Sequence, residues 1–121
     1  EPAFDIGKLA FGFDGFSDIV HGQFRLERNK ENDSYMFEID RKKSSREFRD
    51  SVIECLRDDA FNPIKVLESN LEDRVKFICV FQYLCDLVYR SDIRTILAQV
   101  IQASLTFEEF FPEVDSLYLS L

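Results

Sequence analysis

The sequence contains no tryptophan and a single histidine among its 121 residues. A nucleophile activated by histidine, or a zinc site built with histidine ligands, would have to use His21. The residues that follow it, Gly22 and Gln23, complete no known catalytic motif. We therefore expect His21 to be an exposed strand residue or to make an ordinary polar contact, and we predict no catalytic residue in this chain.

Cysteine is also scarce, with only Cys55, Cys79 and Cys85. The count is odd and there is no C-x-x-C pair, so the spacing favours neither a disulfide framework nor a zinc site. All three lie in apolar helical patterns, which predicts buried, reduced thiols in an intracellular protein, either cytoplasmic or nuclear. We expect no metal and no cofactor.

Long apolar runs are missing as well. The longest, residues 77–81, is far too short to cross a bilayer, so we expect no membrane span. Positive charge is in deficit, because 23 acidic residues face 15 basic ones and the net charge is −8. A phosphate backbone would be repelled on average, and the basic residues near position 45 alternate with acidic ones. Nucleic acid is therefore not the expected partner.

Phenylalanine is the residue that the sequence has in excess, with 13 copies. Its ring brings a large apolar area without a polar tip, which favours an oily core, an oily interface, or both. A chain of this length forms one domain, so we expect a single domain over residues 1–121. The chain begins with Glu1-Pro2 rather than methionine, and we expect it to be excised from a longer protein.

The first third of the chain, residues 1–43, predicts an antiparallel meander. Apolar residues alternate with polar ones, and Asp14-Gly15 between phenylalanines is typical of a tight hairpin. A polar loop over residues 29–34 separates the second strand from the third, in which Tyr35, Phe37 and Ile39 face inward. Residues 16–21 form either part of the second strand or a short turn of helix. The expected strands cover residues 9–13, 16–28 and 35–41.

From Ser44 to the end, residues 44–121, the apolar period changes from two to 3.6 residues, which predicts helices. Three capping-box sequences, each a serine or threonine followed three residues later by glutamate, mark helix starts at residues 44–47, 69–72 and 106–109. The expected helices cover residues 44–60, 62–67, 70–90, 92–101 and 106–121. The fold class is therefore α+β: an N-terminal three-stranded antiparallel meander packed against a C-terminal bundle of three to five helices.

Three points in the helical part stay open. The helices over 70–90 and 92–101 form either a sharp antiparallel corner or one long kinked rod. Pro112 either breaks the last helix or lies in the first turn of a new one, and the last five residues fit a strand equally well. The segment 106–121 either completes the core of its own chain or docks on another protein.

The segment 70–101 organises the rest, because its first helix is apolar on nearly every side between residues 77 and 88. Such a helix is either the buried centre of its domain or shared between its domain and a partner. This surplus of apolar surface predicts a non-enzymatic protein–protein interaction domain of an intracellular complex, which binds another chain as a homo- or hetero-oligomer. The candidate partner-binding residues are Phe77, Phe81, Leu84, Val88, Phe107, Phe110 and Phe111.

Two other functions remain as alternatives. A small acidic domain suits an inhibitor, such as a bacterial immunity protein, that masks a basic toxin or nuclease, since its charge would speed association. The chain could also be an enzyme whose site is built from residues dispersed along the sequence.

Overall fold

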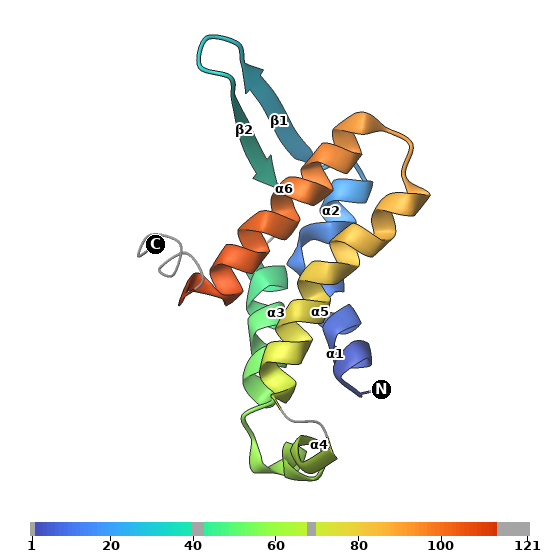
Figure 1. Ribbon diagram of the computed structural model, residues 1–121, viewed down its shortest axis with the longest axis vertical. Coiled ribbons are helices and arrows are strands. Elements are labelled where there is room, and N and C mark those ends of the chain that lie inside the picture. Colours follow the sequence, from blue (N-terminus) through green and yellow to red (C-terminus); the bar gives the residue numbers. More distant parts are fainter. Residues whose placement is uncertain (1, 40–42, 68–69, 114–121) are drawn as a thin grey trace.

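The computed structural model describes residues 2–39, 43–67 and 70–113. Two antiparallel helices, α5 (Leu71–Cys85) and α6 (Ile93–Phe110), form one layer of the molecule. Behind them in Figure 1 lie α1 (Pro2–Phe11) and α3 (Lys43–Cys55). Within the described ranges, no helix has the length and apolar character needed to cross a membrane. Short elements join these helices: η1 (Gly12–Phe16), α2 (Ser17–Val20), η2 (Asp59–Phe61), α4 (Asn62–Leu67) and η3 (Asp86–Tyr89).

The N-terminal segment is helical, which contradicts the predicted first strand and the predicted Asp14-Gly15 hairpin. Gly15 does adopt the positive φ that the turn signal requires, with φ 126° and ψ −2°, but it does so at a kink inside the π-helical segment η1. The kink lets the chain pass from α1 into α2. The short helix α2 also agrees with the alternative prediction of a helical turn within residues 16–21. The buried face of α1 consists of Ala3, Gly7, Ala10 and Phe11.

Two strands, β1 (Phe24–Asn29) and β2 (Ser34–Ile39), form an antiparallel hairpin that extends beyond the helices in Figure 1. The described residues thus contain a two-stranded sheet, and the predicted three-stranded meander is wrong. In register, Phe24 pairs with Ile39 and Leu26 with Phe37. The inner side chains Phe37 and Ile39 pack against the core as predicted, whereas Tyr35, also predicted to face inward, is 50% exposed.

Close contact between α1 and α5 fixes the position of the N-terminal helix. An added Cβ at Gly7 would lie 2.5 Å from Ile78 Cγ2, 2.7 Å from Ile78 Cβ and 3.2 Å from the Val75 carbonyl oxygen. Glycine therefore allows the two backbones to approach each other more closely than any larger residue would. The shared core includes Val75, Cys79 and Tyr83 from the inner side of α5, each 0% exposed.

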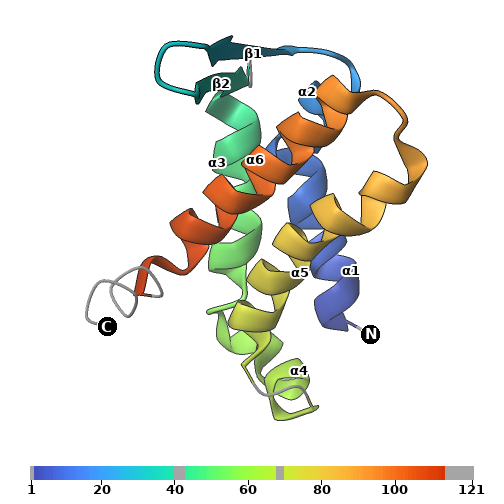
Figure 2. The ribbon, with the colours of Figure 1, turned by 45° about the horizontal axis from the view of Figure 1, so that its top comes forward.

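The helical half follows the predicted order with different boundaries. Helix α3 ends at Cys55 rather than near residue 60, and α4 occupies the expected position after Asn62. Between α5 and α6 the chain makes a sharp corner through η3, which Figure 2 shows from a second direction. The Asp92 side chain caps α6 by accepting hydrogen bonds from Thr95 N (3.2 Å) and Thr95 Oγ1 (2.8 Å).

The predicted helix start at Thr106 is wrong, because α6 continues through this position to Phe110. The backbone leaves the helix at Phe111, with φ −130° and ψ 59°, directly before Pro112. The rest of the predicted tail, residues 114–121, lies outside the described residues.

Candidate functional site

A buried carboxylate, Asp14 of η1, joins four segments that are far apart in the sequence. It is 0% exposed and forms an ion pair with Arg49 Nη1 of α3. The other oxygen of Asp14 accepts hydrogen bonds from Tyr83 OH of α5 (2.6 Å) and Thr106 Oγ1 of α6 (2.6 Å), with Gln102 Nε2 at 3.4 Å. This one charge therefore fastens the kinked N-terminal segment to the three long helices. A buried carboxylate needs such donors to replace its lost water.

The guanidinium of Arg49 is the partner of that charge, and its side chain is 1% exposed. Besides Asp14, its Nη2 donates to Glu109 Oε1 (2.6 Å) and Asp50 Oδ1 (2.5 Å). Burial alone would lower the pKa of Arg49, but the hydrogen bond to Glu109 and the charge of Asp14 outweigh burial and raise it. The guanidinium also lies 4.8 Å from the centre of the Phe110 ring. We interpret this buried network as a structural clamp that keeps Arg49 charged.

Acid should weaken this network through Glu109. Burial raises the pKa of Glu109, but hydrogen bonds from Arg49 and from Arg46 (2.7 Å) outweigh burial, so the pKa lies below its ordinary value of 4.5. A carboxylate whose pKa is lowered on folding stabilises the fold at pH values above its ordinary pKa. This stabilisation is lost as the pH falls through the folded-state pKa. We expect the Glu109→Gln variant to lose less stability than the wild type when the pH falls below 4.5, as measured by urea unfolding across pH. The control variant Glu108→Gln should lose as much stability as the wild type. Identical pH profiles for wild type and Glu109→Gln would contradict this assignment.

The histidine and the cysteines do not form a reactive constellation among the described residues. The Nδ1 atom of His21 lies 2.6 Å from the Ser17 carbonyl oxygen, so Nδ1 carries the proton and donates. This hydrogen bond prevents Nδ1 from accepting a proton from Ser17 Oγ, 3.4 Å away. Burial, with the nearby charge of Asp14, raises the pKa of Cys79 and keeps its thiol protonated. The other two cysteines, Cys55 and Cys85, are exposed, so their predicted burial is wrong.

The outer side of α5 and the segment η3 that follows it carry a row of exposed apolar side chains, which we name the α5 stripe: Phe77, Phe81 and Leu84 of α5 and Val88 of η3. They are 53%, 46%, 44% and 79% exposed, respectively. Within α5, the intervals of four and three residues from Phe77 through Phe81 to Leu84 are those of the apolar seam of a coiled coil. The Phe77 and Phe81 rings stack, with centroids 6.0 Å apart and planes inclined by 14°. Since Val75, Cys79 and Tyr83 fill the opposite side of α5, the helix is apolar on both sides.

A second row continues around the corner onto α6. Its exposed members are Ile93, Leu97 and Val100, and the same spacing then passes through Ser104 to Phe107 and Phe111. We name these six residues the α6 stripe. The inner side of α6 is formed by Ala98, Gln99, Gln102, Ala103, Thr106 and Phe110. The exposed members of the α6 stripe, Ile93, Leu97 and Val100, turn away from the core, whereas Phe107 and Phe111 pack against it.

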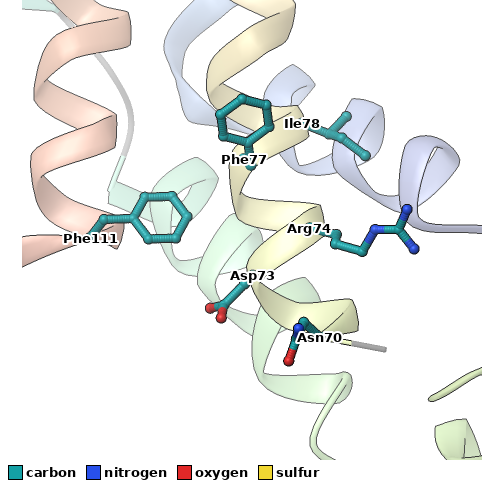
Figure 3. Close-up of a pocket in the computed structure, with 6 residues that line it drawn as sticks. All are labelled: Asn70, Asp73, Arg74, Phe77, Ile78 and Phe111. Carbon is teal, nitrogen blue, oxygen red and sulfur yellow. The ribbon is translucent and has the colours of Figure 1, made fainter. Parts of the chain in front are cut away.

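The two stripes meet around a hollow of about 550 Å³ over the first turns of α5. Figure 3 shows the Phe111 ring reaching toward α5 from α6, while Phe77 stands on α5 itself. Asp73 projects on the side of α5 that faces Phe111, and Arg74 projects on the opposite side. The hollow is completed by Asn70 and Ile78.

No match to a known protein was found. This holds for protein-family models, for curated proteins and for solved structures. The function therefore has to be inferred from the arrangement of this chain's own side chains.

The structure divides the sequence-predicted partner-binding residues into two groups. Phe77, Phe81, Leu84 and Val88 are exposed along one row. From the end of α6, Phe110 is 9% exposed and belongs to the core, and Phe107 and Phe111 are half-buried against it, with their rings 5.2 Å apart. The described part of the tail thus packs on its own chain.

Sequence reasoning missed the buried network altogether. Asp14 resembled a turn residue, and Arg49 and Glu109 resembled solvated charges. One signal was present in α6, where Gln99, Gln102 and Thr106 recur at helical spacing on the same side as alanines. Polar residues in the middle of an otherwise buried helix face indicate that a partner group awaits them inside the protein.

Proposed function

We propose that this protein is a non-enzymatic interaction domain that docks another protein on the α5 stripe. The observation that carries the proposal is a row of four large exposed apolar side chains. Three of them lie at coiled-coil spacing on α5, whose other side is already core, and Val88 follows on η3. Scattered exposed apolar residues are normal in proteins, but a contiguous row is typical of an interaction surface. The expected partner element is an amphipathic helix, which matches such a row with apolar residues at every third or fourth position.

The energetics favour aromatic anchors at the centre of such an interface. Phe77 and Phe81 are stacked and about half exposed, and aromatic side chains that become buried on binding often act as hot spots. Leu84 extends this surface toward the corner, where Val88 and Tyr89 are 79% and 80% exposed. We base the proposal on the exposed residues, because burial of Phe110 in the core leaves its ring little free surface.

The non-enzymatic part of the proposal is supported by how the reactive groups are used. The carboxylate of Asp14 and the guanidinium of Arg49 neutralise each other inside the protein. The thiol of Cys79 is buried and held in its protonated form. These groups maintain the fold rather than offering a free acid, base or nucleophile.

A charge placed in the α5 stripe tests this proposal. We expect Leu84→Glu to abolish capture of the protein's partner from a native extract, because docking would bury an unpaired carboxylate. The matched control is Met36→Glu, which adds the same charge at a 41% exposed apolar residue on the protruding hairpin. Affinity capture with quantitative mass spectrometry should show partners lost from the first variant and kept by the second. Equal capture by both variants, with unchanged thermal unfolding, would refute docking on the α5 stripe.

A further inference from the structure

We propose that the hollow between α5 and α6 seats a basic amphipathic helix, with a lysine or arginine of the partner placed over Asp73. This inference rests on the proposed function and adds the chemistry of the partner to it. The charge of the molecule, the position of Asp73 and the two apolar stripes carry it independently of one another.

The net charge argues first against a second copy of this chain. Each copy carries a net charge of −8, so two copies repel each other, whereas a cationic partner is attracted over a distance. Exposed Glu108 and Glu113 add negative charge near the end of α6, next to Phe111. The overall charge of the chain therefore favours a basic occupant over a self-association interface.

The local geometry then places the cation. Asp73 is exposed and lines the hollow on the side of α5 that faces Phe111. The next residue, Arg74, projects on the opposite side of the helix. Phe77, one helical turn further on, presents a ring that is 53% exposed. A carboxylate beside an open aromatic face suits a lysine or arginine, which gains an ion pair and a cation–π contact together. Arg74 carries the opposite charge, but its guanidinium projects away from Phe111.

The apolar stripes determine where the partner helix needs apolar side chains. A helix lying in this position contacts Phe77 and Leu84 from α5 and Phe111 from α6. It therefore needs apolar side chains at every third or fourth position on one face. Basic residues belong at the edge of that face near Asp73. The expected occupant is accordingly an amphipathic helix with an apolar face and a basic edge.

Two designed peptides serve as the probe. The first is an amphipathic helix of about three heptads with leucine at positions a and d and lysine elsewhere, and the second replaces every lysine with glutamate. We expect the lysine peptide to bind the full chain at least about tenfold tighter than the glutamate peptide, in fluorescence anisotropy titrations at physiological salt. Asp73→Asn should weaken binding of the lysine peptide about twofold to fivefold, as expected for loss of one exposed charge pair.

Leu84→Glu separates seating on the apolar row from general attraction of a cation to an acidic protein. If the peptide is seated there, Leu84→Glu weakens binding of the lysine peptide about tenfold or more, although it adds attractive charge. Met36→Glu adds the same charge and should leave binding unchanged or slightly stronger. Stronger binding to both variants would mean non-specific electrostatic association and would overturn the inference.

The remaining outcomes distinguish this inference from the proposed function. Equal or tighter binding of the glutamate peptide overturns the basic partner but leaves docking on the α5 stripe standing. A wild-type dimer in sedimentation equilibrium that Leu84→Glu converts to monomer would also overturn the basic partner, because the occupant would then be a second copy of the chain. It would leave docking on the α5 stripe standing. Failure of both peptides, together with capture from extracts that Leu84→Glu does not change, overturns the proposed function itself.

Discussion

Replacing Asp14 with alanine is expected to lower the free energy of unfolding by about 3–5 kcal/mol, because removal of one member of a buried ion pair leaves the other charge uncompensated. Among the described residues, Arg49, with its side chain 1% exposed, would keep Glu109 and Asp50 as charged partners. The hydroxyls of Tyr83 and Thr106 would lose their acceptor at the same time. Natural domains of this size have about 5–15 kcal/mol of stability, so the variant should unfold at a much lower urea concentration.

Asp50→Ala provides the matched control for this experiment. Asp50 also accepts a hydrogen bond from Arg49, but its side chain is 55% exposed and water can replace the contact. We expect this variant to lose no more than about 1 kcal/mol. If urea unfolding gives equal losses for Asp14→Ala and Asp50→Ala, the buried carboxylate is not the centre of the network.

Replacing Gly7 with alanine is expected to destabilise the protein by about 1–3 kcal/mol, the usual cost of forcing extra atoms into a packed interior. The intrinsic helix preference of alanine acts in the opposite direction and is worth about 1 kcal/mol. The steric effect dominates because the new Cβ would lie 2.7 Å from Ile78 Cβ, which side-chain rotation cannot move. Helices α1 and α5 must therefore separate. Thermal and urea unfolding would both report the loss.

Gly12→Ala is the corresponding control, since a Cβ added at Gly12 would meet nothing within 4 Å beyond its chain neighbours and the local helix backbone. We expect its stability to be unchanged or increased by up to about 1 kcal/mol. A Gly7→Ala variant that is as stable as Gly12→Ala would show that α1 and α5 tolerate a wider separation than the structure indicates.

The helical half of the fold was largely predictable because its signals are local. A polar cap such as Asp92, and a proline after Asn62, mark helix starts through contacts within one turn of the chain. The N-terminal half was misjudged because its decisive contacts are tertiary. The buried side of α1 includes Ala3, Gly7 and Ala10, whose small size gives little hydrophobic periodicity. Their importance appears only when α5 lies against them.

The candidate site was predictable to a similar extent. The sequence alone identified an apolar surplus around Phe77 and Phe81, since periodicity shows which helix is apolar on too many sides. It did not reveal which side faces the core, because that depends on where α1 and α3 pack. The Thr106 signal failed for the same reason. A threonine followed by glutamate three residues later resembles a helix cap, but here its hydroxyl donates to Asp14 from within α6.

The sequence separations in the buried network have a consequence for the rate of unfolding. Asp14 bonds to residues 35, 69 and 92 positions away, so the chain must close long loops before its carboxylate can leave water. Contacts that form after the main folding barrier slow unfolding without speeding folding. We therefore expect the clamp around Asp14 to lengthen the kinetic lifetime of the native state as well as to raise its equilibrium stability.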